Sequence, residues 1–179
     1  MRLMDRDINI INYLEKFGGA TIQQVADVYF KNSYDASKKR LKKLKDNAFI
    51  KCATHPVLNK KVYYIKKLPS YHSLIINHVC ILLKDKIYKV EREFKIGKTK
   101  VDALILLKNK QIVILEVDIF NKTSQNKYNS IKSAMDSRGL EFEMLIVGKR
   151  KRKISFADYV LVDEIDNIKD VIKSIQYIS

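Results

Sequence analysis

The chain has 179 residues, of which 46% are hydrophobic, and a net charge of +15 from 35 Lys and Arg against 20 Asp and Glu. This apolar content is enough for packed cores and excludes a disordered basic tail. No apolar stretch approaches the roughly 18 residues of a membrane span and no signal-peptide pattern is visible, so we expect a cytoplasmic protein with no membrane partner. The excess of positive charge predicts a polyanionic partner such as nucleic acid.

Three helices are predicted in the first 47 residues. Thr21 is the expected N-cap of the second helix, which continues to residue 28 or 30, and Ser33 is expected to open the third, which continues to about residue 47. The first helix is predicted over residues 5–17. Apolar residues at helical spacing mark the buried faces: Ile8, Ile11 and Leu14 on the first helix, Ile22, Val25 and Ala26 on the second, and Leu41, Leu44 and Ala48 on the third.

A β-hairpin is predicted directly after the third helix. Its first strand starts at Phe49, residues 56–60 form the turn, and residues 61–65 form the return strand. Three helices followed by a hairpin is the element order of a winged helix. We therefore expect a winged-helix DNA-binding domain over residues 1–68.

Positive charge is concentrated in residues 31–67, which hold twelve Lys or Arg residues against only Asp35 and Asp46. Such a density is attracted to duplex DNA, which carries roughly one phosphate charge per 1.7 Å of its axis. The lysines are expected to contact phosphates, while Tyr34 and Ser37 lie near the helix N-terminus, where base edges are usually read. The predicted DNA-binding residues on the third helix and hairpin are Tyr34, Asp35, Ser37, Lys38, Lys39, Lys42, Lys43, Lys60 and Lys61.

A second domain is predicted over residues 71–179. Its pattern indicates helices over residues 71–83, 123–138 and 167–178, and strands over residues 88–96, 101–107, 111–119, 142–147 and 159–162. The order helix, three strands, helix, strand matches the core of the PD-(D/E)xK nuclease fold. The predicted fold class is thus α+β, with a winged helix followed by an α/β nuclease-like domain around a mixed central sheet.

Carboxylates fall where the nuclease fold places its active site. Asp102 starts one predicted strand, and Glu116 and Asp118 point to one face of the next. Three such acids could hold Mg²⁺, which takes oxygen ligands. However, the active motif needs Glu-x-Lys, and this chain has Glu116-Val117-Asp118, although Lys127 on the following helix could supply the amine. We therefore expect no cofactor, with Mg²⁺ bound only if the site is active, and a domain that leans toward being non-catalytic.

The residues around this motif resemble the replication-relaxation family. The matching features are Leu115-Glu116-Val117-Asp118, then Thr123, then Lys127-Tyr128. Members pair an N-terminal winged helix with a nuclease-like domain and are linked to plasmids and other mobile elements. The resemblance implies an accessory role at a replication or transfer origin. Double-stranded DNA is the partner expected from the charge, and a relaxase or replication initiator is a further expected partner. A homodimer is also expected, because winged helices often read paired half-sites.

Three functions are consistent with the sequence. The first is a non-enzymatic DNA-binding accessory protein. The others are a transcriptional repressor with a C-terminal assembly domain and a Mg²⁺-dependent DNA endonuclease. The 17 Tyr and Phe residues are expected mainly in the core, so no aromatic platform for single strands is predicted.

Overall fold

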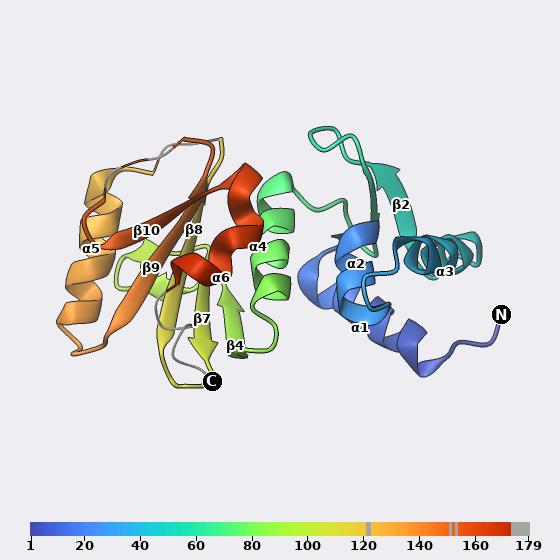
Figure 1. The fold of residues 1–179 in the computed structure, drawn as a ribbon, viewed down its shortest axis with the longest axis horizontal. Helices are drawn as coiled ribbons and strands as arrows, with labels where there is room; N and C mark the ends of the chain where they lie inside the picture. Colours follow the sequence, from blue (N-terminus) through green and yellow to red (C-terminus); the bar gives the residue numbers. More distant parts are fainter. Residues whose placement is uncertain (121–122, 151, 153, 173–179) are drawn as a thin grey trace. The chain divides into compact units, whose positions relative to one another are not determined.

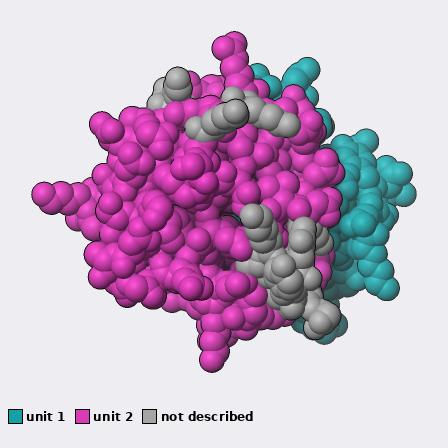
Figure 2. All heavy atoms as spheres, turned by 60° about the vertical axis from the view of Figure 1, so that its left-hand side comes forward, with its two compact units in different colours: residues 1–81 teal, residues 82–179 magenta. Residues whose placement is uncertain are grey.

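The protein is described by a computed structural model covering residues 1–120, 123–150, 152 and 154–172. The chain divides into two compact units, Met1–Ile81 (unit 1) and Leu82–Ser179 (unit 2), coloured separately in Figure 2. No helix among the described residues is both long and apolar enough to cross a membrane.

The division between the units differs from the predicted boundary near residue 70, because helix α4 (Tyr71–Leu82) belongs almost wholly to unit 1. Its buried Asn77 amide donates to the backbone oxygens of Phe17, at 3.2 Å, and Gly19, at 2.9 Å. The Gln24 amide donates to the Leu74 backbone oxygen at 2.8 Å. These buried polar groups find their partners inside unit 1, which ties the helix to it.

The other helices of unit 1 are α1 (Asp5–Phe17), α2 (Ile22–Tyr29) and α3 (Tyr34–Asp46), which confirms the three predicted helices. Thr21 is the N-cap of α2, as predicted: its side chain accepts a hydrogen bond from the Gln24 backbone N–H. The core beneath these helices is formed mainly by aliphatic side chains: Ile10, Leu14, Ile22, Val25, Leu41, Leu44 and Ile50.

Two predicted core positions are wrong. Ile8 is 46% exposed, because the buried face of α1 is instead Asp7, Ile10 and Leu14. Ala48 is also exposed, since α3 ends at Asp46 and the chain turns there with a φ of 62° at Ala48. Ile8 therefore lies within α1 but off its buried face, and Ala48 lies two residues after the end of α3.

Unit 1 also contains a three-stranded antiparallel sheet. Its strands are β1 (Ala20–Thr21), β2 (Lys51–Thr54) and β3 (Lys61–Tyr64), in the order β1-β3-β2. The hairpin was predicted, with its first strand starting two residues earlier; β1 was not, because two residues show no periodicity. Gly19, with a φ of 149°, lets β1 approach β3: a Cβ there would lie 2.8 Å from the Tyr63 backbone oxygen.

Unit 2 is built on a mixed five-stranded sheet, as predicted (Figure 1). Its strands are β4 (Ile87–Arg92), β7 (Ala103–Leu107), β8 (Ile112–Asp118), β9 (Phe142–Gly148) and β10 (Ala157–Leu161). They lie in the order β10-β9-β8-β7-β4. The pairs β4–β7 and β7–β8 are antiparallel, whereas the pairs β8–β9 and β9–β10 are parallel. The carboxyl ends of β8 and β9 therefore share one edge.

The strand predicted over residues 88–96 is interrupted twice. The register shifts between Ile87 and Lys89, and Tyr88 is 73% exposed. Glu93 then adopts a φ of 51°, after which β5 (Lys95–Ile96) pairs with β6 (Thr99–Lys100) as a separate ribbon. The alternation of side chains was read as one strand because a bulge and a turn leave the polarity pattern unchanged.

Helix α5 (Gln125–Asp136) covers one face of this sheet (Figure 1). Its buried Tyr128, Ile131 and Met135 pack in one core cluster with β-strand side chains that include Ile114 and Ile146. At the end of the described chain, a 3₁₀ helix over Val162–Asn167 leads into α6 (Ile168–Val171). The helix predicted over residues 167–178 ends earlier than expected, since Ile172 is the C-cap of α6, and residues 173–178 lie outside the described residues.

Candidate functional site

The outer surface of α3 is cationic. Lys38, Lys39, Lys42 and Lys43, which we call the α3 lysine face, are all exposed, on the side of the helix opposite Leu41 and Leu44. Tyr34, 45% exposed, and the exposed Asp35 lie in the first turn of the same helix. Six of the nine predicted DNA-binding residues are thus exposed on one helix.

Ser37 is not part of this surface, and its predicted contact with DNA is wrong. Its side chain is fully buried and its hydroxyl donates to the Ile22 backbone oxygen at 3.1 Å. Ser37 precedes Leu41 and Leu44 by four and seven residues, so it falls on the core face of the helix. The same spacing in the sequence could have revealed this.

Arg40 also faces inward, where it binds Asp7 of α1. Its Nε donates to the Asp7 carboxylate at 2.5 Å, and its Nη2 makes a second, shorter contact with the other oxygen. Asp7 is fully buried and also accepts from the Met4 backbone N–H at 2.7 Å. The Arg40 hydrogen bonds lower the pKa of Asp7. This two-pronged ion pair fixes α3 against α1 and was not predicted.

The β2–β3 hairpin presents Lys60 and Lys61, both exposed as predicted. The turn before them is organised by His55, which is buried and whose Nδ1 accepts from the backbone N–H groups of Val57, at 3.2 Å, and Leu58, at 3.3 Å. The His55 backbone N–H in turn donates to the Lys60 oxygen at 2.9 Å. The hairpin tip is therefore a defined structure that displays its lysines.

In unit 2, Glu116 of β8 is buried beside Lys127 of α5. The Lys127 ammonium donates to Glu116 Oε2 at 2.7 Å, whereas Oε1 has no hydrogen-bond partner among the described residues. Burial raises the pKa of Glu116 to about 7, although the Lys127 hydrogen bond acts in the opposite direction. Lys127 therefore reaches the acid of the Glu-x-Asp motif from the following helix.

The two other predicted acids have separate roles. Asp102 accepts a hydrogen bond from the Val117 backbone N–H at 2.8 Å and so ties the start of β7 to β8. Asp118 accepts from the Tyr128 hydroxyl at 2.8 Å and from Arg152 at 2.9 Å, and it makes a short contact with the Thr123 hydroxyl. Burial, followed by these contacts with Asp118, raises the pKa of Tyr128.

These carboxylates do not form the predicted metal cluster. Within the described parts of the chain, no group of three or more His, Cys, Asp or Glu side chains could hold a metal ion. The physical reason is that Asp118 is already bound to Arg152, Tyr128 and Thr123, while Glu116 is paired with Lys127. The residues present therefore do not fit a three-carboxylate Mg²⁺ site.

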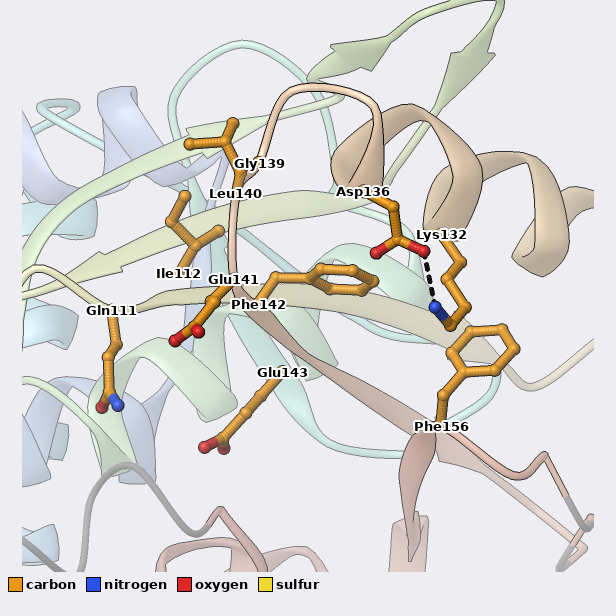
Figure 3. Close-up of a pocket in the computed structure, with 10 residues that line it drawn as sticks. All are labelled: Gln111, Ile112, Lys132, Asp136, Gly139, Leu140, Glu141, Phe142, Glu143 and Phe156. Carbon is orange, nitrogen blue, oxygen red and sulfur yellow. Dashed lines mark hydrogen bonds and ion pairs between the residues drawn. The ribbon is translucent and has the colours of Figure 1, made fainter.

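An open cavity of about 670 Å³ lies at the opposite end of β8 and β9 from these acids. Figure 3 shows its lining, where Lys132 and Asp136 of α5 reach toward each other and form an ion pair at 2.5 Å. The rings of Phe142 and Phe156, together with Ile112 and Leu140, form its apolar part. The cavity contains none of the predicted site residues.

No family model matches this chain, and no curated protein matches it either. Among solved structures, the chain is similar to a repair endonuclease from Pyrococcus abyssi, with 16% identity and a TM-score of 0.35 over 63% of this chain and 48% of that one. It is also similar to the small subunit of the heterodimeric restriction endonuclease R.BspD6I, with 12% identity and a TM-score of 0.39 over 61% of this chain and 73% of that one. Both similar structures are described as endonucleases.

Proposed function

We propose that the chain is a DNA-binding protein whose unit 1 docks on duplex DNA through α3 and the β2–β3 hairpin. The observation that carries this proposal is the α3 lysine face, four exposed lysines opposite the core side of one helix. Four cations on a single rigid helix match the closely spaced phosphates of a duplex. Lys60 and Lys61 add two cations on the hairpin that follows α3.

The topology supports a winged-helix reading of unit 1. From α1 to β3 its order is helix, strand, helix, helix, strand, strand, with α4 following, and the two-residue β1 pairs with β3 of the hairpin. In such a module the third helix enters the major groove while the hairpin follows the backbone. The Asp7–Arg40 ion pair holds α3 in the orientation that presents its lysines.

Within this surface, phosphate contact and base contact fall to different residues. The lysines carry the electrostatic attraction, which does not depend on sequence. Tyr34 and Asp35, in the first turn of α3, are the groups placed to meet base edges. An exposed carboxylate such as Asp35 repels phosphate but accepts a hydrogen bond from the cytosine amino group.

We assign the protein an accessory, non-catalytic role at a replication or transfer origin of a plasmid or other mobile element. The support is the resemblance to the replication-relaxation family together with unit 2, whose acids are bound to Lys127, Arg152 and backbone groups rather than gathered for a metal. A relaxase or replication initiator and a second copy of the chain are the proposed partners. The mixed five-stranded sheet of unit 2 is the architecture expected for the nuclease-like domain that this resemblance implies.

The test is the salt dependence of duplex binding, measured by fluorescence anisotropy. Replacing Lys38, Lys39 and Lys42 with Ala should reduce the slope of log K against log salt by about 2.7, since each phosphate contact contributes roughly 0.9. The matched control removes the same charge from exposed lysines of unit 2: Lys98, Lys108 and Lys110. An equal change of slope in both variants would contradict the assignment of α3.

Two alternatives predict other results. One observation favours a nuclease, namely the contact of Lys127 with Glu116, which places an amine beside the motif acid. This alternative predicts that the protein cleaves duplex, nicked or branched DNA with Mg²⁺ or Mn²⁺ and that Glu116→Ala abolishes the cleavage. That result would establish a nuclease in place of the proposed non-catalytic role. A transcriptional repressor would instead protect its own promoter and leave a replication or transfer origin unprotected.

A further inference from the structure

An exposed aromatic ring and a basic loop meet at one edge of the unit 2 sheet. Phe120, two residues after β8, is 60% exposed, although buried positions dominate the preceding strand. The Lys149 ammonium, directly after β9, lies 5.2 Å from the centroid of the Phe120 ring. Arg150, also exposed, follows it. We call Phe120, Lys149 and Arg150 the cationic edge.

The sheet topology creates this juxtaposition. Strands β8 and β9 are parallel, with Asp118 paired opposite Gly148, so the segments that follow the two strands leave the sheet at the same end. Residues almost thirty positions apart in sequence are thereby brought together.

Described residues on either side of Lys149 and Arg150 make close contacts within unit 2. After Arg150, the Arg152 guanidinium donates to Asp118 at 2.9 Å and to the Thr123 backbone oxygen at 2.8 Å. Before Lys149, the Tyr159 hydroxyl packs so closely on Gly148 that a Cβ there would lie only 1.8 Å from it. Arg152 and Tyr159 are partly buried, whereas Lys149 and Arg150 between these contacts are exposed.

We propose that the cationic edge binds an unpaired DNA strand, with Phe120 stacking on a base while Lys149 and Arg150 contact the adjoining phosphates. Single-strand sites combine exposed aromatic rings with cations that follow the backbone. A duplex cannot use Phe120 in this way, because its bases are stacked on one another and their faces are covered. This site goes beyond the proposed function, since it lies in the other unit and takes another form of DNA.

The experiment measures binding of a labelled oligothymidylate of twenty nucleotides, and separately of a duplex, by fluorescence anisotropy with the full chain. Phe120→Ala should weaken single-strand binding by roughly 5- to 150-fold, the range for loss of one stacked base, while Phe120→Trp should retain it. Lys149→Ala with Arg150→Ala should reduce the salt slope for the single strand by about 1.4, or roughly 0.7 per cation.

Two controls make the result specific. Tyr88 is 73% exposed on β4, so Tyr88→Ala removes a similar ring from another part of unit 2 and should leave single-strand binding unchanged. Lys108→Ala with Lys110→Ala removes two exposed cations from the turn between β7 and β8. Equal losses in the control and edge variants, or no binding of the oligothymidylate by the unmodified protein, would overturn the proposal. Duplex binding that depends on the α3 lysine face is tested separately and could fail without affecting this result.

Discussion

The buried ion pair between Asp7 and Arg40 gives the sharpest test of how unit 1 positions α3. Asp7→Ala removes a fully buried carboxylate and leaves the Arg40 guanidinium, whose side chain is only 16% exposed, without its partner. Breaking a buried pair from one side costs about 3–5 kcal/mol, because the remaining charge stays desolvated. The residual exposure of Arg40 places the expected loss near the lower end, at about 3 kcal/mol.

A loss of this size should be easy to measure. For a domain of 60–100 residues, each kcal/mol shifts Tm by roughly 4–8 °C, so unit 1 is expected to melt about 12–24 °C lower. Because the chain has two units, hydrogen exchange of peptides from α1 and α3 should report the change, while peptides from β8 and β9 stay protected.

A double-mutant cycle decides whether the pair is the cause. Arg40→Ala in the Asp7→Ala background should cost about 1.5–3 kcal/mol less than Arg40→Ala alone, since the two side chains interact directly. The exposed pair Lys45–Asp46 is the matched control, and Asp46→Ala should cost less than about 1 kcal/mol. Additive losses from Asp7 and Arg40, or a cost for Asp7→Ala as small as the control's, would refute this reasoning.

Three further predictions follow from buried polar groups and close contacts. The Glu116 carboxyl should titrate with a midpoint near 7 by ¹³C NMR, and a midpoint below 5 would contradict the burial argument. Because this pKa exceeds the ordinary value of 4.5, the folded state binds the proton more tightly, so the stability of unit 2 should fall as the pH rises from 4.5 to 7. The Glu116→Gln variant should not show this trend. His55→Phe should leave two backbone N–H groups of the hairpin turn without an acceptor and lower the free energy of unfolding by roughly 1–3 kcal/mol. Hydrogen exchange at the Leu58 amide should then accelerate. An unchanged exchange rate would count against the role of His55 in organising the turn. Gly148→Ala should lower the free energy of unfolding by roughly 1–3 kcal/mol, measured by thermal denaturation. Adding Tyr159→Phe to this variant should restore part of the lost stability, because the added Cβ meets the Tyr159 hydroxyl first. If no stability is restored, the strain lies elsewhere.

The local elements of unit 1 could be predicted because their signals are local. Helices α1 and α3 were predicted from apolar spacing, with Ser33 expected to open α3, and the start of α2 followed from the Thr21 cap. The α3 lysine face was also predicted, since four lysines between core positions must point outward. The same rule would have placed Ser37 inside, had the core face been extended toward the helix N-terminus.

Contacts between distant residues were decided only by the tertiary structure. Asp7 and Arg40 stand 33 positions apart, and each alone resembles an ordinary surface charge, so only the packing of α1 on α3 reveals the pair. Asp118 lies in a motif that suggested a metal ligand, yet it forms an ion pair with Arg152, 34 positions later in the sequence. Sequence determines which elements form, because periodicity and capping act over a few residues. The partner of a charge depends on which elements pack together, because desolvation at that contact favours one pairing over the others.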